Sequence, residues 1–249
     1  MNKKIITYFC SLLFALTVQA QAPEWVTVSK DNMAIVFEQM SNWYKNNTNY
    51  SVVVTHTSYQ THTTTVPYEK SVGFFKKEKN NYHSFLLGIH TIQNTNCKII
   101  LDTANNAMMV ANVDNSIWTA YTLEDYKYTL KMCKEIKVVT INTDKKYRLE
   151  YSEGYPLERY EFIVAADGSL KEVIWYYSKK IPKDIDDENS EKVKPRLSIT
   201  LSAYKKLQSG SNKNEFDETK YFVKKGNKLF PSEKYKNFTL SDQRIVLTH

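Results

Sequence analysis

The sequence predicts an α+β fold that is mostly β, with an antiparallel sheet of about ten strands and two or three helices. Apolar and polar residues alternate along much of the chain, most clearly from 145 to 204, and a period of two is the pattern of half-buried strands. Loops of about two to five residues separate most of the strand segments, and such loops join antiparallel neighbours. Two further segments carry apolar residues at steps of three and four, which is the spacing of a helix lying on a core.

The first residues predict a secretory signal peptide at 1–20. Lys3 and Lys4 precede an apolar run that ends near Val18, and cleavage after Ala20 or Ala22 would leave small residues where a signal peptidase reads them. The run is shorter than the ~20 residues that a membrane span needs. We therefore expect a periplasmic or secreted protein with no transmembrane segment.

The remaining residues, 21–249, are expected to form a single domain. Hydrophobic residues make up 42% of the sequence, and only 6 Gly and 6 Pro occur, which favours a packed body over disorder. Loss of Lys3 and Lys4 with the leader lowers the formal charge of +7 by two. Because the remaining charges are interspersed and form no basic block, the composition indicates no nucleic-acid partner.

The segment 31–46 predicts the first helix. Met33, Phe37 and Met40 recur at helical spacing on one face, and Ser29 is a candidate cap. Such a stripe indicates a helix lying on a core, and a helix over the mouth of a sheet would also act as its lid.

Strand patterns follow from Tyr50 onward and form the first β half. The predicted strands after the first are 69–77, 82–93, 97–103 and 107–113. If 82–93 is one strand, then Phe85, Leu87 and Ile89 share a face, whereas His83 and His90 do not.

A second helix is expected after a cap at Thr122, with Leu130 and Cys133 on its apolar face. The second β half then has strands at 136–141, 147–151, 160–164, 173–177 and 197–201. Asp167-Gly168 predicts a tight hairpin turn. Phe162, Trp175 and Tyr177 belong to one aromatic face of this half.

Two segments lie outside this pattern. Residues 182–195 are acidic and contain no aromatic, which predicts an exposed loop. The tail, 211–249, contains Tyr235, Phe238 and Leu240, enough apolar side chains to dock on the body.

No motif for a nucleophile, a metal site or a phosphate-binding loop occurs in the sequence, so we expect neither an enzyme nor a cofactor. Glu150 and Glu161 fall on the polar faces of successive strands. Cross-strand contacts with Arg148 and Arg159 would explain them without catalysis.

The two cysteines outside the leader, Cys97 and Cys133, suggest a disulfide in an oxidising compartment. The alternative is that each is a small buried side chain.

The order of elements resembles the LolA/LolB-like lipoprotein-carrier superfamily, with segments such as Val72-Gly-Phe-Phe-Lys-Lys, Ile99-Ile-Leu-Asp-Thr and Met108-Met-Val-Ala-Asn-Val. The resemblance implies a strongly curved, unclosed half-barrel whose hollow is covered by helices and accepts lipid acyl chains.

The resulting functional hypothesis is an exported envelope protein that binds a lipid, a lipoprotein acyl chain or another apolar ligand, as a carrier or chaperone. The expected ligand-binding residues are Met33, Phe37, Met40, Phe85, Leu87, Ile89, Phe162, Trp175 and Tyr177. The alternative is a non-enzymatic interaction module with a filled core that recruits an envelope protein partner. A cavity of several hundred Å³ would favour the first, and a large exposed apolar patch the second.

Overall fold

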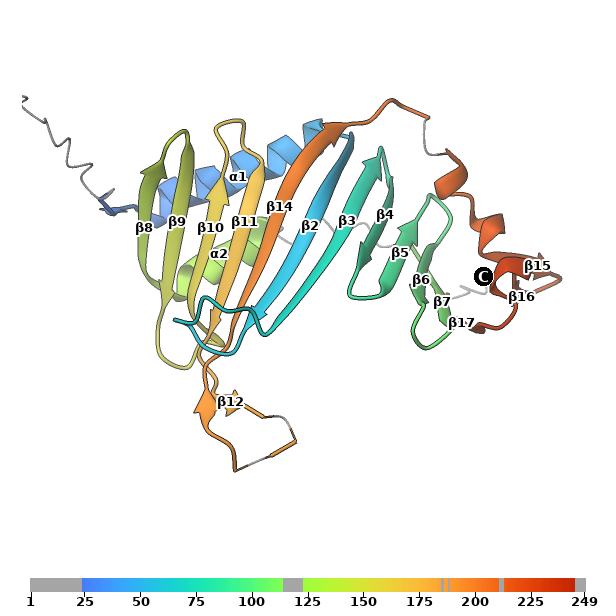
Figure 1. Ribbon diagram of the computed structural model, residues 1–249. Coiled ribbons are helices and arrows are strands. Elements are labelled where there is room, and N and C mark those ends of the chain that lie inside the picture. The colour runs from blue at the N-terminus through green and yellow to red at the C-terminus, as the bar shows by residue number, and fades with distance from the viewer. Residues whose placement is uncertain (1–23, 114–122, 185, 188, 211–212, 245–249) are drawn as a thin grey trace, which may run out of the picture.

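The computed structural model describes residues 24–113, 123–184, 186–187, 189–210 and 213–244 (Figure 1). The predicted signal peptide, 1–20, and the predicted cap Thr122 lie outside these residues. The helices are α1 (Lys30–Asn46) and α2 (Leu123–Met132), with short 3-10 helices at Lys213–Glu215, Glu218–Lys220 and Glu233–Tyr235. The strands are β1 (Val26–Thr27), β2 (Asn49–Tyr59), β3 (Glu69–Glu78), β4 (Asn81–Leu86), β5 (Ile89–Gln93), β6 (Lys98–Asp102), β7 (Ala107–Ala111), β8 (Cys133–Ile141), β9 (Asp144–Tyr151), β10 (Leu157–Val164), β11 (Leu170–Tyr177), β12 (Ile181–Pro182), β13 (Lys192–Val193), β14 (Arg196–Lys206), β15 (Phe222–Lys225), β16 (Lys228–Pro231) and β17 (Thr239–Asp242).

A large, open, curved sheet dominates the fold, as the predicted mostly β class requires (Figure 1). Its strand order is β1-β8-β9-β10-β11-β14-β2-β3-β4-β5-β6-β7-β17, so two antiparallel meanders meet where β14 pairs with β2. The prediction of about ten strands is too low, because this sheet has thirteen and the described residues contain seventeen in all. The short strand β1 and the tail strand β17, which pairs in parallel with β7, each add a strand at an edge.

The segment expected as one strand from 82 to 93 is in fact a tight hairpin. Leu86 pairs with Ile89, and the two residues between them, Leu87 and Gly88, have φ values of 52° and 80°. Positive φ at both central positions is the conformation of a type I′ turn. Little in the sequence predicts this turn, because leucine rarely adopts a left-handed conformation.

The two faces of the sheet follow from the register, since directly paired residues point to the same side. We call the side that carries Val52, Phe75 and Phe162 the helix face, because α1 and α2 pack there. We call the other side, which carries His83 and Glu161, the tail face. Figure 1 shows both helices behind the sheet and the tail at the far end from β8.

On the helix face, α1 builds the larger of two cores. Ser29 caps the helix, accepting a hydrogen bond from the Asn32 amide at 3.2 Å. Met33, Phe37 and Met40 are buried against the sheet, where Phe37 stacks on Phe162 with ring centroids 5.6 Å apart. The predicted apolar face of this helix is therefore confirmed.

On the tail face, the strands on the β8 side carry an ionic network centred on Glu161. Its carboxylate lies 2.8 Å from Lys146 Nζ, 2.8 Å from Arg148 Nε and 3.1 Å from Arg159 Nε. Burial opposes ionisation, yet these three cations outweigh it and hold the pKa of Glu161 below its usual range. The expected cross-strand contact of Glu161 with Arg148 is confirmed. Arg159 reaches Glu161 from two residues away on the same strand, and its directly paired residue on β9 is Glu150.

The acidic segment 182–195 contains a two-stranded hairpin, β12–β13, that stands away from the sheet (Figure 1). Within the described residues, no helix is both long and apolar enough to cross a membrane.

Candidate functional site

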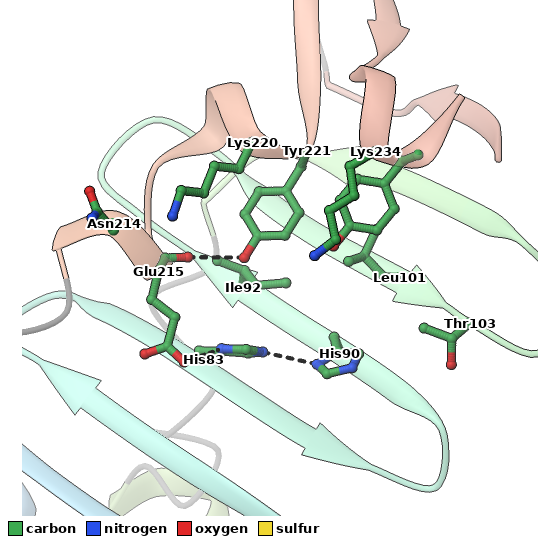
Figure 2. A pocket seen from close by; sticks show the side chains of 11 residues that line it. His83, His90, Ile92, Leu101, Thr103, Asn214, Glu215, Lys220, Tyr221 and Lys234 are labelled. Carbon is green, nitrogen blue, oxygen red and sulfur yellow. Dashed lines mark hydrogen bonds and ion pairs between the residues drawn. The ribbon is translucent and has the colours of Figure 1, made fainter. Parts of the chain in front are cut away.

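A cavity of about 770 Å³ lies on the tail face, between the strands β4–β6 and the C-terminal segment (Figure 2). We call it the tail pocket. Its walls come from segments far apart in sequence: the strands and the turn after them supply His83, His90, Ile92, Leu101 and Thr103, and the tail supplies Asn214, Glu215, Lys220, Tyr221, Lys234 and Tyr235.

The floor of the pocket is set by the register of β4, β5 and β6. His83 pairs with Ile92, and His90 pairs with Leu101, so these four side chains occupy adjacent positions on one face. Ile92 and Leu101 belong to the smaller of the two cores. The floor therefore combines two apolar core side chains with two imidazoles on its β4–β5 side.

The cover of the pocket is a tail held by its own aromatic residues. Phe216, Tyr221 and Phe222 are buried in the smaller core. The Tyr221 hydroxyl donates a hydrogen bond to the Glu215 carbonyl at 3.0 Å, and the Tyr221 ring stacks on Tyr235 with centroids 5.7 Å apart. These contacts place two tyrosine rings over the floor.

A chain of polar contacts crosses one wall of the pocket (Figure 2). Glu215 Oε1 lies 2.7 Å from Lys76 Nζ and 3.1 Å from His83 Nδ1, and His83 Nε2 lies 3.0 Å from His90 Nδ1. Because a carboxylate only accepts, His83 Nδ1 must donate to Glu215. In the neutral state, His83 Nε2 then accepts from His90 Nδ1.

The electrostatics of the wall favour neutral imidazoles beside a charged carboxylate. Burial lowers the pKa of His83, although Glu215 acts in the opposite direction. Burial and the nearby Lys234 ammonium lower the pKa of His90. For Glu215, burial is outweighed by Lys76 and His83, so its pKa lies below the usual range. Both histidines are thus uncharged at neutral pH.

The predicted ligand-binding residues on the helix face fall into a packed core. Met33, Phe37, Met40 and Phe162 are buried there, and Trp175 packs against them. A ligand would reach the first three only if α1 moved. Tyr177 is half-buried at the end of β11, on the same face as Trp175. Ligand binding by these residues stays a prediction.

The other three predicted residues do not share a face, because the hairpin at Leu87 and Gly88 separates them. Phe85 pairs with His90 on the tail face, whereas Ile89 pairs with Leu86 on the helix face. Leu87 lies in the turn with 47% of its surface exposed. The same hairpin brings His83 and His90 together, so the expectation that they lie on opposite faces is wrong.

The predicted disulfide is also wrong for this fold. Cys97 and Cys133 have free, buried thiols, and each belongs to a different core. Cys133 opens β8, and Cys97 directly precedes β6, which is far from β8 in the order of the sheet. At ~4.8 Å per strand their separation is roughly 40 Å along the sheet, whereas a disulfide needs Cα atoms within about 7 Å. The alternative of two small buried side chains describes both residues.

Sequence reasoning missed most of the tail pocket. Its lysines carry no local signal, and its histidines were placed on the wrong faces. In the described residues, no group of three or more His, Cys, Asp or Glu side chains is arranged to hold a metal ion. What the pocket can do chemically is hold an apolar group in a half-open hollow beside two tyrosine rings and present ammonium groups at its tail wall.

The chain matches no protein-family model and no curated protein sequence. Its structure is similar to an uncharacterized conserved protein from Thermus thermophilus, at 8% identity, with 74% of this chain and 93% of that chain covered and a TM-score of 0.42. It is also similar to the lipoprotein LppX of Mycobacterium tuberculosis, at 8% identity, with 73% of this chain and 99% of that chain covered and a TM-score of 0.40. A third similar structure is a LolA superfamily protein from Nitrosomonas europaea, at 9% identity, with 75% of this chain and 96% of that chain covered and a TM-score of 0.31. The superfamily that the sequence resembles is thus represented among the similar structures.

Proposed function

We propose that this protein binds a lipid or another apolar ligand, and that the tail pocket receives it. The observation that carries the proposal is a cavity of about 770 Å³ between the sheet and the tail. Small-molecule sites are typically cavities of about 300–1,000 Å³ with apolar walls and a few convergent polar groups. Ile92, Leu101 and Tyr221 form its buried apolar walls, each at most 7% exposed, and the half-buried ring of Tyr235 adds accessible apolar surface.

Burial of an apolar chain in the pocket can offset the cost of association. Each CH₂ group transferred from water contributes ~0.8 kcal/mol, so a chain of about ten carbons contributes ~8 kcal/mol. That amount is comparable to the translational and rotational free energy lost on association. The ligand therefore needs a substantial apolar part.

The setting we propose is the cell envelope, on the basis of the leader at 1–20. A protein that holds an acyl chain there would act as a carrier or chaperone and would need no catalytic group. A lipid or a lipoprotein acyl chain is the corresponding partner.

The test is to measure co-purified lipid and the affinity for a neutral fluorescent probe, N-phenylnaphthylamine. Thr103 lines the pocket, and its hydroxyl donates a hydrogen bond to the Gly88 carbonyl at 3.0 Å. Thr103→Trp should fill the pocket and weaken probe binding, whereas Thr103→Val removes the same hydrogen bond without filling it. We expect Thr103→Val to bind the probe as the wild type does.

Two results would contradict the proposal in different ways. Binding that survives Thr103→Trp but is lost in Trp175→Ala would place the ligand on the helix face, beneath α1. Absence of both co-purified lipid and probe binding would contradict ligand binding itself and favour the interaction-module alternative.

A further inference from the structure

The tail pocket holds more positive than negative charge. Lys220 and Lys234 both line it, and the carboxylate in its wall, Glu215, is already paired with Lys76. Within the described part of the chain, neither Lys220 nor Lys234 has a carboxylate at ion-pair distance. Figure 2 shows the two ammonium groups on either side of the Tyr221 ring, above the strands that carry the histidines, with that of Lys220 on the side of Asn214 and Glu215.

The histidines leave this imbalance in place. Both imidazoles have lowered pKa values and are neutral at pH 7, as described above. The Glu215 carboxylate is held by Lys76 and by His83, so it is not available to the two tail lysines. An incoming anion would therefore meet two ammonium groups that are in no ion pair within the described residues, although the Asp217 carboxylate acts on Lys220 from beyond ion-pair distance.

An apolar run leads out of the pocket along the same face of the sheet. The Phe85 ring lies 4.5 Å from the His90 ring between centroids, and the Phe74 ring lies 6.2 Å from Phe85. Val72 is two residues from Phe74, so it points to the same side, and 56% of its surface is exposed. An apolar chain longer than the pocket could continue along this run.

We infer that the ligand is an amphiphile with an acidic head group, held by Lys220 and Lys234, and with its apolar chain on the floor of the tail pocket and along Phe85 and Phe74. This inference rests on the proposed function, because it assigns a chemical class to the ligand of the same site. Charge complementarity distinguishes it from a neutral lipid, since desolvating two ammonium groups without an anion would weaken binding.

The test compares ligands that share a chain and differ in the head group: dodecanoate, dodecyl phosphate and the methyl ester of dodecanoic acid. Each is measured by displacement of N-phenylnaphthylamine from the wild type, from the double variant Lys220→Gln/Lys234→Gln and from the control Lys225→Gln/Lys236→Gln. The control has the same change in charge within the tail, but its residues do not line the pocket.

For the wild type and the control, we expect the acids to bind about tenfold or more tightly than the ester, as charge-assisted hydrogen bonds predict. In the pocket variant the preference should fall to about one, because the acids lose their ammonium partners while the ester no longer has to desolvate them. Added salt should weaken the binding of the two acids and leave the binding of the ester unchanged.

Equal affinity of the wild type for acid and ester would overturn the head-group inference while leaving apolar binding intact. Absence of displacement by any of the three ligands, with no probe binding, would overturn the proposed function as well. A preference that survives in the pocket variant would place the head group elsewhere and overturn its assignment to the two lysines. If acetate or inorganic phosphate competes as well as the long-chain acids, the site binds free anions, and the inference of an amphiphilic ligand is overturned.

Discussion

Replacement of Glu161 by glutamine tests whether the ionic network on the tail face stabilises the fold. Glutamine keeps the size and one acceptor oxygen of the side chain, so packing changes little, and the loss of charge is the main effect. Glu161 is only 2% exposed and has three cationic partners within 3.1 Å. The substitution therefore leaves three cations close together without their shared anion.

The size of the expected loss of stability depends on the solvent exposure of those three cations. Removal of one partner from a fully buried ion pair costs about 3–5 kcal/mol. Here the side chains of Lys146, Arg148 and Arg159 are 22%, 25% and 31% exposed, so water screens part of their repulsion. We expect the free energy of unfolding to fall by about 2–3 kcal/mol and the melting temperature by roughly 5–10 °C.

The assay is urea unfolding followed by tryptophan fluorescence, with Glu158→Gln as the control. Glu158 pairs with His62 and Lys194 near the surface, and 41% of its side chain is exposed, so its substitution should cost less than about 1 kcal/mol. Equal, small effects of the two substitutions would refute the reasoning.

Acid unfolding gives an independent check of the same network. Because the folded state lowers the pKa of Glu161, the unfolded state binds more protons as the pH falls. The contribution of Glu161 is complete above its unfolded value of 4.5 and is lost as the pH falls through the lower folded value. The Glu161→Gln variant should therefore lose less stability than the wild type over that pH range.

Three further outcomes are expected. Phe37→Ala should lower the free energy of unfolding by about 3–5 kcal/mol. Ile35 is exposed on the same helix, so Ile35→Ala should lower it by less than about 0.5 kcal/mol. Similar losses of stability in the two variants would contradict the packing of α1. Gly73→Ala should lower the free energy of unfolding by at least about 2 kcal/mol, because a Cβ there would lie 1.9 Å from a backbone carbonyl oxygen of the facing strand. An unchanged urea midpoint would contradict that close approach. Burial raises the pKa of Cys97 to about 12 and that of Cys133 to about 11. Both thiols should therefore resist a thiol reagent at pH 8 in the folded protein and react with it after denaturation. If neither thiol reacts in urea, the two cysteines form a disulfide.

Local patterns predicted local structure well. The helical spacing of Met33, Phe37 and Met40 needs only one helix to bring them onto one face, and the structure shows that face buried. The pairing of Glu161 with Arg148 likewise followed from alternation on adjacent strands.

The errors concern backbone conformation and long-range position. The turn at Leu87 and Gly88 reversed the faces expected for Ile89 and His90, and so brought His90 beside His83. An even number of cysteines says nothing about their distance, which here is set by the order of strands in the sheet. The tail pocket depends on where residues 213–242 come to lie, and their aromatic residues predicted docking without specifying the docking surface.

The seam between β2 and β14 has a consequence for how the chain folds. Arg196 pairs with Tyr59 in the middle of the sheet, so the first meander cannot be joined to the second until most of the chain has emerged. Non-local pairing of this kind slows folding. Until β14 arrives, the long strand β2 has an unpaired edge, and such edges recruit strands from other molecules. A chain that emerges from its amino terminus would therefore carry this unpaired edge from the emergence of β2 to that of β14.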